Sequence, residues 1–223
     1  MNIAKNIAEI NKKIATAAAK AKRHPSDIKL VAVTKTVGIS QIEELLNLGI
    51  SDIAENRLQQ ALPKIEALSK RNILSKSIKW HFIGHLQKNK GRKVLKYFDI
   101  IHSVDSLDLA NRINTIAQQE NKKVQILLEV NISGETNKYG LDPYKLDYFL
   151  DKCKMLSMLE VKGLMTMAPF SDNKEDSRPI FRQLKQLAAR YKLPELSMGM
   201  SNDFEVAIEE GATFIRIGSA LFY

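Results

Sequence analysis

The sequence predicts an α/β fold, namely a single (β/α)8 barrel of the TIM type with an extra N-terminal helix. From residue 29 to the end, short apolar runs rich in β-branched residues alternate with longer amphipathic stretches. Eight such runs can be counted, which is the number of strands in that barrel. A length of 223 residues also lies in the range that one barrel fills. We therefore expect one domain over residues 1–223.

The expected strands and helices alternate along the chain. The strands should cover residues 29–35, 52–55, 80–84, 100–105, 124–132, 161–167, 196–200 and 214–218. One helix is expected over residues 40–47, and others should begin at residues 57, 88, 106, 143, 176 and 202. Ser40 is the expected N-cap of the first of these, because Glu43 follows at the spacing of a capping box.

The first segment is expected to form a helix that docks on the barrel. Its isoleucines recur at helical spacing, at positions 3, 7, 10 and 14. Because the eighth expected strand ends the chain, this helix would take the place of the one missing after it. An open, doubly wound sheet is the competing fold. That fold usually has fewer strands and a glycine-rich phosphate loop after the first strand, and no such loop occurs here.

The charge of the chain favours anionic partners in general. The formal net charge is +9 and the pI is about 9.5. The densest basic stretch, Lys88 to Lys96, has no interleaved aromatic residues for stacking on bases, and only Tyr97 follows it. A solvated helix face is therefore favoured over a nucleic-acid groove, and no nucleic-acid partner is expected.

Membrane association and metal binding are not expected either. No apolar run approaches the length needed to cross a bilayer. Cys153 is the only cysteine, which excludes an intramolecular disulfide and a multi-cysteine metal site. A reducing, cytoplasmic location is the one that fits a single cysteine.

Lys35 is the first candidate site residue, because it ends the apolar run at residues 30–34. Side chains at the C-terminal ends of barrel strands are where such folds carry their chemistry. One interpretation is a lysine that simply emerges into solvent. The other is an amine whose pKa is lowered by desolvation, so that it attacks a carbonyl carbon and forms an imine.

A phosphate site at the ends of the last two strands favours the second interpretation. Ser201, Gly218 and Ser219 fall in the loops that usually hold phosphate in this fold, where hydroxyl and backbone N–H groups converge on an anion. Each also has a structural interpretation, with Ser201 as a helix N-cap and Gly218 as a turn residue. Together they favour the phosphate site.

Arg216 lies within the last expected strand, on the face that it shares with Phe214 and Gly218. Its guanidinium needs an acceptor there. One candidate is a salt bridge to Glu129 of the fifth strand. The other is a hydrogen bond donated to the pyridine nitrogen of a cofactor, which would leave that nitrogen unprotonated and disfavour transaminase-type chemistry.

Two further polar residues follow strands two and three. Asn56 could hydrogen-bond a ring hydroxyl of such a cofactor, although an N-cap for the helix beginning at Arg57 explains it equally well. His81 is expected to be a satisfied core histidine without a catalytic role.

These residues belong to motifs that identify a family. The motifs are VAVTK at residues 31–35, Glu55-Asn56, WHFIGHLQKNK at residues 80–90, GLMTM at 163–167, LSMGMS at 196–201 and Arg216-Ile217-Gly218. With them the chain resembles the pyridoxal phosphate homeostasis protein family, whose members are related to the N-terminal barrel of bacterial alanine racemase. The resemblance covers essentially the whole chain. Its strings WHFIGxLQxNK and SMGMS are the most specific.

The resemblance implies that pyridoxal 5′-phosphate (PLP) is held as a Schiff base on Lys35. It further implies phosphate contacts from Ser201, Gly218 and Ser219, and a contact of Arg216 with the pyridine nitrogen. The implied role is vitamin B6 homeostasis without established catalytic turnover, so neither a catalytic residue nor a metal ligand is expected. The expected partners are PLP and PLP-requiring apo-enzymes, and the expected state is a monomer.

Two departures from the family pattern and two competing functions remain. Ala54 stands where the family usually has glycine, and the chain stops at Tyr223, short of the family's usual few further residues.

An amino-acid racemase would use the same imine but needs a second acid–base group, which alanine racemase takes from a separate domain. Tyr139 is the tyrosine that could replace it here. An imine-forming aldolase acting on a sugar phosphate would share Lys35 and the phosphate loops.

Overall fold

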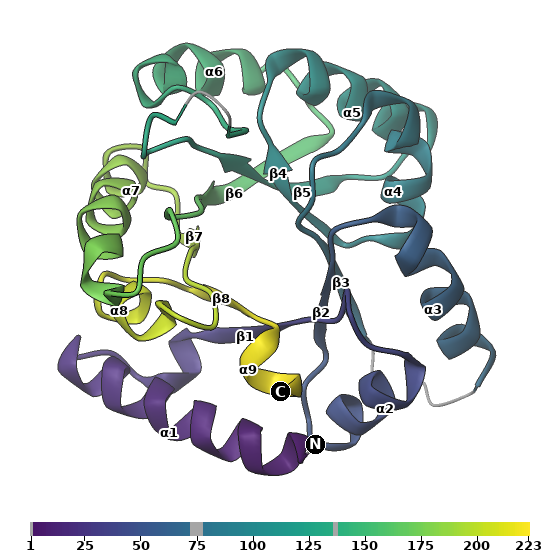
Figure 1. The fold of residues 1–223 in the computed structure, drawn as a ribbon. Coiled ribbons are helices and arrows are strands. Elements are labelled where there is room, and N and C mark those ends of the chain that lie inside the picture. The colour runs from purple at the N-terminus through teal and green to yellow at the C-terminus, as the bar shows by residue number, and fades with distance from the viewer. Residues whose placement is uncertain (1, 72–77, 136–137) are drawn as a thin grey trace.

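A closed barrel of eight parallel strands forms the centre of the molecule. The computed structural model describes residues 2–71, 78–135 and 138–223. The strands pair in chain order, and β8 pairs with β1 to close the ring (Figure 1). Their bounds are β1 Lys29–Val33, β2 Asp52–Glu55, β3 Lys79–Phe82, β4 Ile100–Val104, β5 Val124–Glu129, β6 Leu159–Met165, β7 Glu195–Ser197 and β8 Phe214–Ile217. The predicted barrel is confirmed.

Helices surround the strands on the outside of the ring (Figure 1). They are α1 Ile3–Lys20, α2 Ile39–Asn47, α3 Leu58–Lys70, α4 Gly91–Tyr97, α5 Leu107–Gln119, α6 Leu146–Cys153, α7 Arg178–Arg190, α8 Phe204–Glu209 and α9 Ser219–Phe222. Short 3-10 turns precede several of them, at η1 Pro25–Asp27, η2 Lys88–Lys90, η3 Pro143–Lys145 and η4 Lys174–Ser177. Within the described ranges, no helix combines the length and the apolarity that crossing a membrane requires.

The two ends of the chain complete the outer layer together. The last strand does not end the chain as expected, because α9 follows β8 directly. Helix α1 buries its four isoleucines, packs against α8 and α9, and lies outside β1 in Figure 1. The side-chain amide of Asn6 donates a hydrogen bond to the carbonyl of Leu221 over 2.9 Å, which fastens α1 to α9. The predicted docking of the first helix is therefore confirmed.

Several predicted boundaries are wrong by one to three residues. All strands except β2 end before the predicted positions, so the polar residues that follow them lie in loops at the mouth of the barrel. Ser40 is not the N-cap of α2. That position is taken by Gly38, whose N–H donates to the side-chain oxygen of Gln41 over 3.0 Å. Helix α8 begins at Phe204 rather than at residue 202.

Two hydrophobic layers hold the barrel together. The inner layer fills the ring itself and consists of Val31, Val33, Ala54, Ile100, Leu127, Met165 and Phe214. The outer and larger layer lies between the strands and the helices. Because side chains alternate along a strand, Phe214 in the inner layer places Arg216 on the inner face as well. A cation therefore enters the interior of the barrel.

Candidate functional site

Four neighbouring loops carry the predicted site residues. Lys35 follows β1, Asn56 follows β2, Ser201 follows β7, and Gly218 and Ser219 follow β8. In the closed ring β7, β8, β1 and β2 are consecutive neighbours, and all run in the same direction. Their C-terminal ends therefore meet along one arc of the barrel mouth, and the five residues lie on that arc.

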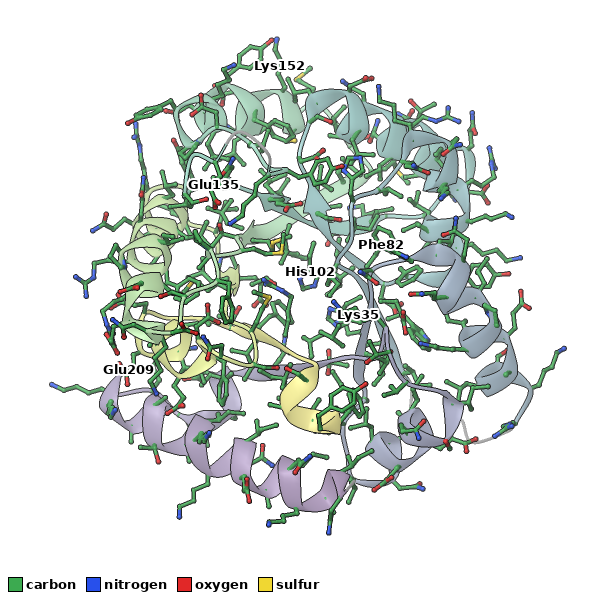
Figure 2. The ribbon with its side chains drawn as sticks, viewed as in Figure 1. Lys35, Phe82, His102, Glu135, Lys152 and Glu209 are labelled. Atoms are coloured by element: carbon green, nitrogen blue, oxygen red, sulfur yellow. The ribbon has the colours of Figure 1, made fainter. Side chains whose placement is uncertain are left out.

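Lys35 lies two residues beyond the end of β1. Ala32 of β1 pairs with Ile217 of β8, so Lys35 and Gly218 leave adjacent strands at the same edge. Figure 2 shows Lys35 near the centre of the view, beside the strands of the ring. Its side chain is exposed, so the burial expected of this amine is not found. Because β1 already ends at Val33, the lysine lies in a loop that solvent reaches.

A buried anchor holds the residue that precedes Lys35. The hydroxyl of Thr34 donates to Oε1 of Glu55 over 2.7 Å, and Nζ of Lys64 donates to the same oxygen over 2.8 Å. Lys64 also donates to the carbonyl of Thr34 over 2.7 Å. The Glu55 side chain is fully buried, and removing one partner of a buried pair typically costs about 3–5 kcal/mol. The loop of Lys35 is thus fixed from the side of β2 and α3.

Ser201 faces the loop after β8. Its Oγ accepts hydrogen bonds from the N–H groups of Gly218 at 3.4 Å and Ala220 at 3.3 Å. The N-cap interpretation of Ser201 is wrong, because α8 begins at Phe204 and its N-cap is Asp203. Two backbone N–H groups thus converge on one hydroxyl oxygen, an arrangement that an oxygen of a bound anion also satisfies.

Asp203 and Gly199 shape the turn that presents Ser201. The carboxylate of Asp203 accepts the N–H of Met200 at 2.6 Å and the hydroxyl of Ser177 at 3.1 Å. Gly199 has φ +88, and a Cβ there would lie 2.5 Å from the Cβ of Ala207. Only glycine fits this position without strain. The GMS sequence at residues 199–201 is therefore a turn requirement as well as a candidate site.

The loop after β8 contributes Gly218 and Ser219. Gly218 has φ −121, and a Cβ there would make ordinary contacts with Val33 at 3.5 Å, so the fold alone does not require glycine. Ser219 is exposed and begins α9. A role of both residues in binding a ligand remains a prediction.

Asn56 presents an unpaired acceptor. Its Oδ1 is buried and has no hydrogen-bond partner among the described residues. The N-cap interpretation is wrong, since Arg57 is the N-cap of α3. A Cβ on Gly84 would lie 2.0 Å from the carbonyl oxygen of Asn56, so glycine lets the loop after β3 pass this residue. Beside it opens a polar cleft of about 690 Å³, whose walls include His85 and Tyr139.

Arg216 is buried inside the barrel and satisfied by neutral acceptors. It donates to the hydroxyl of Ser197 over 2.7 Å and to the carbonyl of Thr166 over 3.0 Å. Burial lowers the pKa of its guanidinium to about 10, against the opposing charges of Asp203 and Glu129. The alternative interpretation, a salt bridge to Glu129, is wrong, because the described residues include no ion pair between the two side chains within 4.0 Å.

Glu129 is a buried carboxyl group near this cation. Burial and then the charge of Asp105 raise its pKa to about 7, and the charge of Arg216 opposes the shift. The carboxyl is therefore half protonated near neutral pH, which is unusual for a glutamate.

His81 and His102 form a buried pair that the sequence predicted only in half. Nδ1 of His81 lies 2.9 Å from Nε2 of His102, and Nε2 of His81 lies 2.9 Å from Oδ1 of Asp52. The expectation of a satisfied core histidine at position 81 is confirmed. Nδ1 of its partner His102 lies 2.8 Å from the hydroxyl oxygen of Ser197. Only the alternation of strand residues could have placed His102 inside the barrel.

The basic stretch at residues 88–96 is partly neutralised. Lys88 forms an ion pair with Asp108, and Arg92 pairs with Glu120. Both acids belong to or follow α5. This pairing agrees with the predicted solvated helix face.

The fold and the mouth define a class of barrel, which a comparison with protein families also identifies. A family model described as "Alanine racemase, N-terminal domain" matches residues 5–223. The chain is 45% identical over 204 residues to a pyridoxal phosphate homeostasis protein of Synechocystis sp., covering 89% of this chain and 92% of the relative. The corresponding protein of Aquifex aeolicus is 40% identical over 228 residues, covering 100% and 98%. The chain therefore belongs to the pyridoxal phosphate homeostasis protein family.

Solved structures agree with this assignment. PipY of Synechococcus elongatus, solved without PLP, superposes with a TM-score of 0.88 at 34% identity over 100% of both chains. The same protein with PLP bound gives 0.86 at 33% identity, again over 100% of both chains. An alanine racemase of Clostridium difficile has a TM-score of 0.76 at 15% identity, and this chain covers 56% of it. The last similarity shows the fold alone.

The raised pKa of Glu129 predicts a specific dependence of stability on pH. Between its ordinary value of 4.5 and about 7 the folded chain binds this proton more tightly than the unfolded chain does. The free energy of unfolding should therefore fall as the pH rises through that interval, by roughly 3 kcal/mol at most. Glu129→Gln should remove this decline, as measured by urea unfolding at several pH values. The exposed Glu66→Gln is the control, and a Glu129→Gln curve parallel to wild type would contradict the prediction.

Proposed function

We propose that the chain binds PLP as a Schiff base on Lys35 and acts in vitamin B6 homeostasis without catalytic turnover. One observation carries this proposal. The loops after four consecutive strands bring an exposed amine, a hydroxyl with two converging N–H groups, and an unpaired amide oxygen to one arc of the mouth. The names of the relatives and the PLP-bound structure of PipY support the same ligand.

Lys35 supplies the covalent link in this proposal. Its amine attacks the aldehyde carbon of PLP, a C=N bond replaces the C=O bond, and the carbonyl oxygen leaves as water. The anchor of Thr34 on Glu55 and Lys64 keeps the loop in place during this exchange. Because Lys35 is exposed, both PLP and an acceptor of PLP can reach it.

The other site residues hold the phosphate and the ring. Ser201, Gly218 and Ser219 provide hydroxyl and backbone N–H groups for the phosphate. Asn56 accepts a hydrogen bond from the ring hydroxyl through its free Oδ1. Arg216 donates to the ring nitrogen, and with a pKa of about 10 it keeps its own proton at neutral pH. Bound PLP is an electron sink, and an unprotonated ring nitrogen weakens that property.

The biological setting follows from the same proposal. The chain works in the cytoplasm as a monomer of one domain and passes PLP to apo-enzymes that require it. A holding protein needs a reversible link and an accessible amine, and an imine on an exposed lysine satisfies both conditions.

Substitution of Lys35 tests the covalent link. Wild-type protein should turn yellow with PLP, and borohydride should bleach it and attach the mass of reduced PLP to Lys35. Lys35→Ala should lose the imine absorbance but keep weak, noncovalent binding through the phosphate residues. Lys29→Ala, at the opposite end of β1, serves as the control. A wild-type protein that stays colourless with PLP but is labelled by a sugar phosphate and borohydride would instead establish the aldolase alternative.

Ser201→Ala tests the phosphate cradle. Loss of a hydrogen bond to a charged group should weaken PLP affinity about tenfold while the imine still forms. Equilibrium titration of the imine absorbance measures the change, and Asn202→Ala, an exposed neighbour, is the matched control. Equal affinities for wild type and Ser201→Ala would remove Ser201 from the site.

The racemase alternative rests on one aromatic contact. The rings of Tyr139 and His85 stack at the mouth with their centroids 4.0 Å apart, which holds a tyrosine near the candidate site. We expect the PLP-loaded protein to exchange the α-proton of L-alanine in D2O no faster than free PLP does, followed by NMR. Exchange well above that rate, and lost in Tyr139→Phe, would establish a racemase.

A further inference from the structure

An unbroken series of hydrogen bonds crosses the interior of the barrel. It runs from Oδ1 of Asp52 to His81 at 2.9 Å, from His81 to His102 at 2.9 Å, from His102 to Ser197 at 2.8 Å, and from Ser197 to Arg216 at 2.7 Å. These residues come from β2, β3, β4, β7 and β8. Since β4 and β7 are not neighbours in the ring, the contact between His102 and Ser197 spans the interior.

The two ends of this series differ in exposure. The Asp52 side chain is 24% exposed, and Asp52 lines a basal cavity of about 310 Å³. His81, His102 and Ser197 have no exposed surface. The ring of Phe214 packs edge-on against both imidazoles, with centroids 5.8 Å and 5.4 Å apart. Among the described residues, the side-chain polar groups in the middle of the series are hydrogen-bonded to one another.

The two ends of the series limit the directions that its hydrogen bonds can take. Burial opposes ionisation of Asp52, but its hydrogen bond with His81 and the charges of Lys79 and Lys29 keep the pKa of its carboxyl lowered. A carboxylate only accepts, so Nε2 of His81 carries a proton. Burial holds the pKa of His102 well below its usual value, and the charges of Arg216 and Lys79 act in the same direction, so His102 is a neutral ring.

We propose that Asp52, His81, His102 and Ser197 form a one-way hydrogen-bond relay that positions Arg216. With neutral rings, His81 donates from Nε2 to Asp52, His102 donates from Nε2 to Nδ1 of His81, and Ser197 donates to Nδ1 of His102. The oxygen of Ser197 then turns a lone pair toward Arg216, which only donates.

The relay fixes one arm of the guanidinium and the carbonyl of Thr166 fixes another. Arg216 therefore has one orientation inside the barrel, and no hydrogen bond to a described residue uses its remaining N–H groups, to which a ligand at the mouth can bind. Asp52, His81, His102 and Ser197 are positioning residues, since Arg216 is the group that would reach the ligand. Only this last step rests on the proposed function.

Imidazole nitrogen NMR on the protein without PLP tests the relay itself. The chain has four histidines, so the resonances of His81 and His102 can be assigned with single His→Gln variants. Both rings should show the neutral form protonated at Nε2, and Ser197→Ala should shift the tautomer balance of His102. A doubly protonated His81, or a His102 protonated at Nδ1, would reverse the direction of the relay and overturn the proposal.

PLP binding tests the positioning of Arg216. Ser197→Ala should weaken PLP affinity about tenfold and shift the pH midpoint of the imine absorbance, because one guanidinium arm loses its acceptor. Ser197→Thr, which keeps the hydroxyl, should restore both. Thr213→Val removes a hydroxyl between the same two strands but outside the relay, and should match wild type. An unchanged affinity and midpoint in Ser197→Ala would refute the positioning role.

The two proposals fail in different ways. If wild-type protein takes up no PLP, the proposed function fails, while the NMR measurement still decides the relay. If wild type binds PLP and the histidines show the reversed tautomers, the relay fails and the proposed function stands.

Discussion

The buried guanidinium of Arg216 is the constraint on which the interior of this barrel depends. A donor-only cation without water must find acceptors within the ring, because an unpaired buried charge is costly. Ser197 and the carbonyl of Thr166 supply them. Ser197 in turn lies against His102, and the two imidazoles lead to the partly exposed carboxylate of Asp52. One arginine on β8 thus explains polar residues on four other strands.

The mouth combines a fixed frame with an open rim. Directly behind the rim, Thr34, Glu55 and Asp203 are buried and hydrogen-bonded. On the rim itself, Lys35 is exposed and Oδ1 of Asn56 has no partner among the described residues. This division suits a binding site, since a ligand gains the most from groups that are already positioned and lose no other partner when it binds.

Much of the fold follows from local patterns, and the deviations have physical causes. Eight apolar runs predict eight strands because a barrel strand faces the barrel interior on one side and the surrounding helices on the other. Their ends were predicted too late, because the residues after Val33 and Ser197 remain apolar or β-branched while the backbone already turns toward the mouth. The four residues of α9 are too few to show a helical period. The cap at Ser40 was wrong because Gly38 and Gln41 provide an alternative that begins two residues earlier.

The candidate site was predictable only where topology alone places residues. Strand order brings Lys35, Ser201 and Gly218 to one edge. Side-chain partners joined over long separations leave no local trace, as for Lys64 on Thr34 or His102 on Ser197, which is 95 positions away. Asp203 shows the same limit at short range. Ser201 and Asp203 are both possible N-caps of α8, and the sequence alone does not show that Asp203 takes this position.

Arg216 and Glu129 show why an ion pair was a reasonable candidate but is not formed. Opposite charges on facing strands should pair if both are ionised. Here the cation is satisfied by neutral oxygens, while burial and Asp105 raise the pKa of Glu129 to about 7. Near neutral pH the interior therefore holds a fixed hydrogen-bond donor beside a weak acid rather than a neutralised pair. Such a donor remains available to an unprotonated nitrogen at the mouth, and a salt bridge would have used it up.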